Sequence, residues 1–195
     1  MTTKDNLYGL VLSGGKSTRM GRDKGQLLYH GMPHRDYLYH LLNKFCERSF
    51  LSIRKSQQTE INQNQEFIVD TDEFKGPLNG ILSAHQLFPE ASWLVLACDL
   101  PFMDQKAVSQ LIENRDKEKV ASVFATTKSK LPEPLCALWE PEGLKKVKKW
   151  LETSETSCPR KFLINSDTKL VFPENDKVLF NANSKLDYQE ALSKI

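Results

Sequence analysis

Residues 7–24 read LYGLVLSGGKSTRMGRDK, and they decide the fold class. The apolar run Leu7–Leu12 predicts a buried strand, and a loop with three glycines and four cationic side chains follows it at once. Glycines let backbone N–H groups come close to phosphate oxygens and adopt positive φ, while Arg and Lys neutralise the charge. This order of strand and loop is typical of a polyphosphate site in an α/β protein.

Two familiar phosphate-binding loops do not fit this stretch. A Walker A loop would need a glycine five residues before Gly15, but position 10 is Leu. A dinucleotide fingerprint of the form G-x-G-x-x-G is absent too, because Gly14 and Gly15 are adjacent and the next glycine is Gly21. A P-loop NTPase and a hydride-transfer enzyme are therefore both disfavoured.

Apolar runs and helical patterns alternate along the rest of the chain. Strands are expected at 50–53, 67–69, 93–97, 120–125, 135–139 and 178–180, and helical segments at 37–45, 77–87, 106–114, 142–151, 161–164 and 186–195. Strand, helix and strand in succession predict a three-layer α/β fold with a mostly parallel sheet flanked by helices. We expect one domain over 1–195, with a nucleotide-binding half at about 1–115 and an acceptor-binding half at about 116–195.

Ligands of such sheets bind beyond the carboxyl ends of the strands, which here means after Leu12, Val69 and Ala97. Asp99 follows the most apolar strand, where its carboxylate would face the crevice. One or two carboxylates together with phosphate oxygens suffice for Mg²⁺, so Asp99 is the predicted metal ligand. The alternative is a turn-forming or helix-capping role, and Asp104 fits the cap better.

Composition sets wider limits. The chain has 195 residues, and 27 basic against 25 acidic side chains give a net charge of +2, so neither nucleic acid nor a membrane surface is an expected partner. No apolar run reaches the roughly 18 to 20 residues of a membrane span, and the cytoplasm is the predicted location.

The four cysteines form no C-x-x-C pair and are predicted to be buried thiols. His30 and His34 are disfavoured as metal ligands because Gly31 and Pro33 interrupt a helix.

The quoted stretch resembles a known signature. Leu12–Lys24 is similar to the L-x-G-G-x-S-x-R-M-G-x-D-K segment of the MobA-type nucleotidyltransferases, the molybdenum cofactor guanylyltransferases. The segments 76–80 (GPLNG), 98–102 (CDLPF), 134–138 and 180–184 resemble later segments of that family, so the resemblance spans about 7–190. It implies a Rossmann-like nucleotidyltransferase fold of the glycosyltransferase-A kind.

The resemblance also implies a reaction: Mg²⁺-dependent transfer of GMP from GTP to the terminal phosphate of molybdopterin or its molybdenum-loaded form, with release of pyrophosphate. Transient contact with cofactor-delivering or molybdoenzyme-maturation proteins is left open. The residues it implies as catalytic are Arg19, Lys24 and Asp99, with Asp99 also the metal ligand. Those implied as nucleotide-binding are Leu12, Ser13, Gly14, Gly15, Arg19, Lys24, Asp70, Gly76 and Asp99, and those implied as acceptor-binding are Pro134, Leu135, Asn181 and Asn183.

Several alternatives stay open. Asp72, two residues beyond Asp70, is a second candidate for the nucleoside contact. The Gly14–Gly15 pair is similar to the guanylyl branch of the family, whereas cytidylyl relatives tend to show Ala-Ala there. A cytidylyl or sugar-phosphate nucleotidyltransferase of the same fold is the runner-up, and a GTP-binding regulatory module without turnover is the reading from another class.

Three positions depart from the family pattern. His34–Tyr37 replaces a small apolar segment, which suggests a change in acceptor entry or in a subunit contact. Arg54 stands near the usual place of an Asn and could bind phosphate instead. Asn79 takes the place of a small residue and could shift the ribose pocket.

Overall fold

A computed structural model describes residues 6–15 and 23–195 of the chain. Its strands are β1 (Leu7–Leu12), β2 (Arg48–Ile53), β3 (Phe67–Val69), β4 (Ser92–Ala97), β5 (Ala121–Ala125), β6 (Pro132–Trp139) and β7 (Lys169–Val171). Its helices are α1 (His34–Leu42), α2 (Leu78–Leu87), α3 (Gln105–Glu113), α4 (Pro141–Leu151), α5 (Pro159–Ile164) and α6 (Lys185–Leu192). Short 3-10 helices are η1 (Lys24–Gln26), η2 (Lys55–Glu60) and η3 (Asp176–Leu179).

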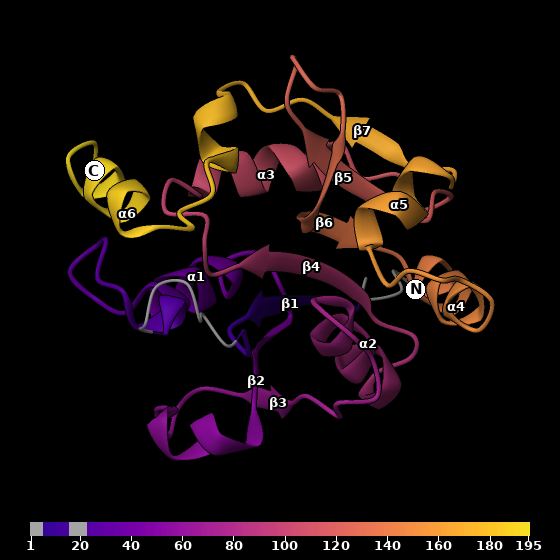
Figure 1. Ribbon diagram of the computed structural model, residues 1–195, viewed down its shortest axis with the longest axis horizontal. Helices are drawn as coiled ribbons and strands as arrows, with labels where there is room; N and C mark the ends of the chain where they lie inside the picture. The colour runs from indigo at the N-terminus through magenta and orange to yellow at the C-terminus, as the bar shows by residue number, and fades with distance from the viewer. Residues whose placement is uncertain (1–5, 16–22) are drawn as a thin grey trace.

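The strands form one sheet in the order β3-β2-β1-β4-β6-β5-β7 (Figure 1). Neighbouring strands pair in parallel from β3 to β4 and again between β5 and β7, whereas β6 runs antiparallel to both β4 and β5. The predicted mostly parallel sheet is therefore confirmed. The strand order reverses between β1 and β4, because the chain builds outward from β1 to β3 and then returns to add β4 on the other side of β1.

Helices cover both faces of the sheet because its side chains alternate in direction. On β4, Leu94 and Leu96 join one apolar cluster together with side chains of α1 and α3. Trp93 and Val95 join the other cluster, which includes side chains of α2, α4 and α5. The central strand is buried on both faces, and this explains why its sequence is apolar from Trp93 to Ala97.

Some predicted elements differ from the structure. The expected strand at 178–180 is wrong: Val178 and Leu179 belong to η3, where they are buried in the core and the Asn175 side chain accepts a hydrogen bond from the N–H of Lys177. The seventh strand is instead β7, beside β5, which the sequence pattern did not predict. The first helix begins at His34 rather than at residue 37. Asp104 caps α3 as predicted, since its Oδ1 accepts a hydrogen bond from the N–H of Ala107 at 2.8 Å.

Two further expectations concern membranes and cysteines. Within 6–15 and 23–195, the helices are too short or too polar to cross a bilayer. All four cysteines are free thiols, but only Cys98 and Cys136 are buried, while Cys46 is half-buried and Cys158 is exposed. The prediction of four buried thiols is therefore wrong for two of them.

Candidate active site

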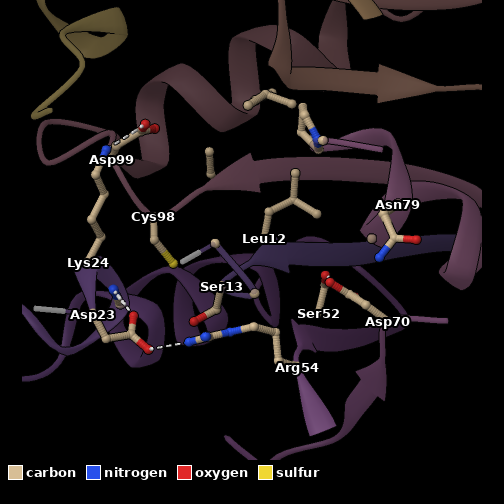
Figure 2. Close-up of a pocket in the computed structure, with 18 of the residues that line it drawn as sticks. Leu12, Ser13, Asp23, Lys24, Ser52, Arg54, Asp70, Asn79, Cys98 and Asp99 are labelled. Carbon is tan, nitrogen blue, oxygen red and sulfur yellow. Dashed lines mark hydrogen bonds and ion pairs between the residues drawn. The ribbon is translucent and has the colours of Figure 1, made fainter. Parts of the chain in front are cut away.

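A cavity of about 710 Å³ opens at the carboxyl ends of β1 and β4, where the strand order reverses (Figure 2). Leu12 ends β1, and Cys98 and Asp99 directly follow β4. Because β6 runs in the opposite direction, its first half lies at this same edge, and Leu135 reaches the cavity. The site therefore occupies the position at which open α/β sheets bind their ligands.

At one end of the cavity, Lys24 and Asp99 point toward each other (Figure 2). Lys24 Nζ lies 3.4 Å from Asp99 Oδ2 and donates a hydrogen bond to Asn183 Oδ1 at 2.6 Å. The N–H of Ala182 donates to the carbonyl of Asp99 at 2.8 Å, which ties the chain after η3 to the turn after β4. Segments remote in sequence thus place a cation, a carboxylate and an amide side by side.

The second carboxylate oxygen of Asp99 can still accept a hydrogen bond or bind a cation. Asp99 Oδ1 is buried and has no hydrogen-bond partner among the described residues. A buried carboxylate oxygen without a partner is costly, and the cost is removed when the oxygen accepts a hydrogen bond or binds a cation. This end of the cavity is therefore suited to a ligand that brings a cation.

At the other end, Asp70 lies beside Ser52 (Figure 2). Ser52 Oγ donates a hydrogen bond to Asp70 Oδ1 at 2.7 Å. Burial raises the pKa of the Asp70 carboxyl to about 6, with a smaller contribution from the nearby charge of Asp72. Asp72 also lines the cavity, but it is exposed and has φ of 60°. Asp70 is thus the less exposed carboxylate of the two.

The two glycines after β1 differ in their surroundings. A Cβ added to Gly14 would lie 2.5 Å from Asp70 Oδ2, so only glycine lets the backbone pass this carboxylate. Within the described residues, no atom lies within 4 Å of a Cβ added to Gly15, and the φ of Gly15 is outside the left-handed region. The positive φ expected in this loop therefore does not apply to Gly15; the described glycines with positive φ are Gly31 and Gly76.

The structure brings most of the predicted site residues to the cavity. Those that line it are Leu12, Ser13, Gly14, Gly15, Lys24, Asp70, Gly76, Asp99, Leu135 and Asn183. Arg19 lies outside the described residues. Pro134 and Asn181 lie close by but are not among the lining residues: the carbonyl of Pro134 accepts a hydrogen bond from Trp139 Nε1, and Asn181 Nδ2 donates to the carbonyl of Leu179.

Other lining residues were not among the predicted set. They include Asp23, Ser52, Arg54, Phe74, Asn79 and Cys98. Ser52 is a buried hydroxyl inside an apolar strand, and that break in the pattern is the one signal that could have indicated it. At the edge of the cavity, Arg54 Nη2 lies 4.0 Å from Asp23 Oδ2. Asn79 Oδ1 accepts a hydrogen bond from the N–H of Phe74 and so holds the turn after β3.

The His34–Tyr37 segment has a different role from the one expected. His34 is fully buried, and its Nε2 hydrogen-bonds to the carbonyl of Leu100, while Tyr37 OH donates to the carbonyl of Met103. His30 stacks on Tyr37 at 3.9 Å and hydrogen-bonds to the carbonyl of Pro101. Since a carbonyl only accepts, each ring nitrogen donates. The segment therefore holds the turn after Asp99 from inside, and most of it is too buried to form a subunit contact.

The parallel sheet, the glycine-containing loop and the facing cation and carboxylates define a nucleotide-binding α/β protein. Comparison with known proteins narrows this class, because residues 9–169 match the family described as the MobA-like NTP transferase domain. The chain belongs to this family.

Two relatives and one solved structure illustrate the similarity. The chain is 42% identical over 183 residues to the molybdenum cofactor biosynthesis bifunctional protein of Synechocystis, covering 93% of this chain and 52% of that protein. It is 30% identical over 105 residues to the molybdenum cofactor guanylyltransferase of Pseudomonas entomophila, covering 53% of this chain and 55% of that one. The chain thus spans about half the length of these two curated relatives.

The solved structure shows the fold alone. It is molybdopterin-guanine dinucleotide biosynthesis protein A from Archaeoglobus fulgidus, which superposes with a TM-score of 0.78 at 22% identity, covering 96% of this chain and all of that one. The expected nucleotidyltransferase fold is confirmed.

Proposed function

We propose that this protein transfers GMP from GTP to the phosphate of molybdopterin, or of its molybdenum-loaded form, and releases pyrophosphate. The proposal is supported by the family, by the names of its relatives and by one geometric observation. That observation is the meeting of Lys24, Asp99 and Asn183 at the strand-order reversal, where one cavity runs from a cationic end to the half-buried carboxylate of Asp70.

The two ends of the cavity suit the two parts of a nucleotide. Lys24 would neutralise phosphate charge, and the backbone N–H groups of Gly14 and Gly15, which line the cavity, would reach phosphate oxygens. Asp70 would accept hydrogen bonds from donors of the nucleoside, which guanine supplies at its N1 and exocyclic amine. The absence of a Cβ at Gly14 leaves room for this carboxylate at the cavity.

Mg²⁺ fits the residues of the cationic end. Asp99 Oδ1 is buried without a partner among the described residues, and Asp99 Oδ2 already faces Lys24. Among the described residues no group of three or more His, Cys, Asp or Glu side chains gathers, so phosphate and water oxygens would complete the coordination. Bound there, Mg²⁺ would supply positive charge that polarises the phosphoryl group.

The side chains of this protein would then position the substrates and neutralise the charge on their phosphates. Phosphoryl transfer needs an attacking phosphate oxygen aligned with the α-phosphorus, and little covalent chemistry from the protein. Lys24 would leave Asn183 for phosphate oxygens and stabilise the charge that develops on pyrophosphate. Asn183 and Leu135 would face the acceptor on the opposite side, and Arg19 would add a second cation from the glycine segment.

The test is acceptor-dependent release of pyrophosphate. The protein is mixed with molybdopterin, Mg²⁺ and one of GTP, CTP, UTP or ATP, and each mixture is repeated without acceptor. Release with GTP alone, and only when molybdopterin is present, is expected. A preference for CTP or UTP would instead indicate a cytidylyl or sugar-phosphate nucleotidyltransferase, and GTP binding without release would indicate a regulatory module.

A further inference from the structure

Gln57 lies in η2, outside the residues that line the cavity, and it is 2% exposed. Its Oε1 accepts hydrogen bonds from the backbone N–H of Arg54 at 2.8 Å and from Arg54 Nε at 3.4 Å. Its Nε2 donates to the carbonyl of Ser13 at 3.1 Å and to Asp23 Oδ2 at 2.5 Å. The amide therefore uses both donors and both acceptor positions, which is the full capacity of a glutamine side chain.

The two acceptors of the Gln57 amide, in Ser13 and Asp23, lie on the two described arms of the glycine-containing segment, 13–15 and 23–26. Ser13 immediately precedes Gly14, and its own N–H donates to the carbonyl of Ser52 at 2.9 Å. Asp23 caps η1, because its Oδ1 accepts from the N–H of Gly25 at 2.9 Å, and Lys24 is the first residue of that helix. One buried amide thus fastens the end of β1 to the backbone that carries Lys24.

We propose that Gln57 is a positioning residue for the phosphate-binding end of the site. It acts through Asp23, by holding the backbone from which Lys24 reaches Asp99 and Asn183. The nucleotide-binding part of this inference rests on the proposed function, whereas the geometric part concerns the protein alone.

The amide itself is required for this role. A leucine of similar size would leave the Ser13 carbonyl and Asp23 Oδ2 without their buried partner. A glutamate would set a carboxylate against the carboxylate of Asp23 and against the carbonyl of Ser13, and both contacts are repulsive. Exposed Gln58, the next residue, offers a matched control because its side chain makes none of these contacts.

The experiment compares Gln57→Leu and Gln57→Glu with Gln58→Leu and the unsubstituted protein. GTP affinity is measured by calorimetry with Mg²⁺, and amide hydrogen exchange is followed in peptides covering 23–27 and 92–97. For both Gln57 variants we expect GTP affinity to fall tenfold or more and exchange at 23–27 to accelerate tenfold or more. Exchange in β4, at 92–97, should stay within twofold, as should every value for Gln58→Leu.

A charge-swapped pair adds a test that a merely structural role would not pass. Asp23→Asn restores a donor opposite the new carboxylate of Gln57→Glu and keeps an oxygen for the N–H of Gly25. The double variant should therefore recover at least threefold in GTP affinity over Gln57→Glu alone. If Gln57→Leu does not fold, this pair decides the question.

The outcomes separate the two proposals. GTP binding without transfer by the unsubstituted protein would overturn the proposed reaction and leave the comparison of affinities valid. Failure to bind GTP would overturn the proposed function, and exchange at 23–27 would still decide the geometric role. Equal exchange at 23–27 in Gln57→Leu and Gln58→Leu, or equal GTP affinity of these two variants, would overturn the role of Gln57.

Discussion

Asp70→Asn is expected to stabilise the folded protein while it weakens nucleotide binding. The carboxyl of Asp70 is half-buried, and this partial burial raises its pKa from an ordinary 3.8 to about 6. The folded protein therefore holds this proton more tightly than the unfolded chain does. The charged form costs folding free energy above pH 6, and this cost disappears as the pH falls through the window from about 6 to 3.8. Asparagine has no charge to bury, and its Oδ1 can still accept the hydrogen bond from Ser52 Oγ.

The size of the effect follows from the shift. Roughly two pKa units at about 1.4 kcal/mol per unit give an upper value of about 3 kcal/mol. Because the side chain keeps some contact with solvent, we expect about 1–3 kcal/mol at pH 8. For a chain of this length each kcal/mol corresponds to roughly 2–4 °C in Tm. The variant should therefore melt several degrees higher at pH 8 and gain about a third as much at pH 4.5.

Urea unfolding of Asp70→Asn and of the unsubstituted protein at pH 8 and pH 4.5 measures this difference in unfolding free energy. Asp72→Asn is the control. Asp72 is exposed, so its substitution should change the unfolding free energy by less than about 0.5 kcal/mol at either pH. Calorimetry with GTP at pH 8 should show a loss of affinity of about tenfold for Asp70→Asn, since the nucleoside loses its charged acceptor. A variant that is destabilised at pH 8, or equally stabilised at both pH values, would refute the reasoning.

Four further variants test the cationic end and the glycines. Lys24→Ala should lower GTP affinity and turnover by tenfold or more with little change in Tm, because its side chain meets phosphate rather than the core; unchanged affinity would remove Lys24 from the site. Asp99→Asn should leave Tm nearly unchanged while transfer falls steeply, and superimposable curves of rate against Mg²⁺ concentration for variant and unsubstituted protein would rule out the metal role. Gly14→Ala should cost GTP affinity tenfold or more, because the Cβ would meet Asp70 Oδ2 at 2.5 Å, whereas Gly15→Ala faces open space and should cost far less. Equal losses in the two glycine variants, measured by calorimetry, would show that this contact is irrelevant.

Local patterns were sufficient for the centre of the fold. Apolar runs predicted β1 and β4 because both strands are buried on two faces, and such strands need apolar residues at every position. The order of strand and helix predicted a parallel sheet, and the glycines and cations after β1 predicted which edge of it binds ligand. Short apolar runs gave no such guidance: Val178 and Leu179 are apolar because they pack beneath the core, not because they pair with a strand. The three residues of β7 were too few to show a period.

The sequence by itself was enough to predict the fold class, which the structure confirms, and to propose a polyphosphate-binding first loop and the candidate carboxylates Asp70 and Asp99. Those features depend on residues close together in the chain, where spacing and composition carry the information. The tertiary structure decided the partners that lie far apart in sequence. Asn183 meets Lys24 across 159 positions, and Gln57 reaches Ser13 across 44. Such contacts depend on how the strands order themselves and on which buried polar atoms must find partners, and no local pattern encodes either.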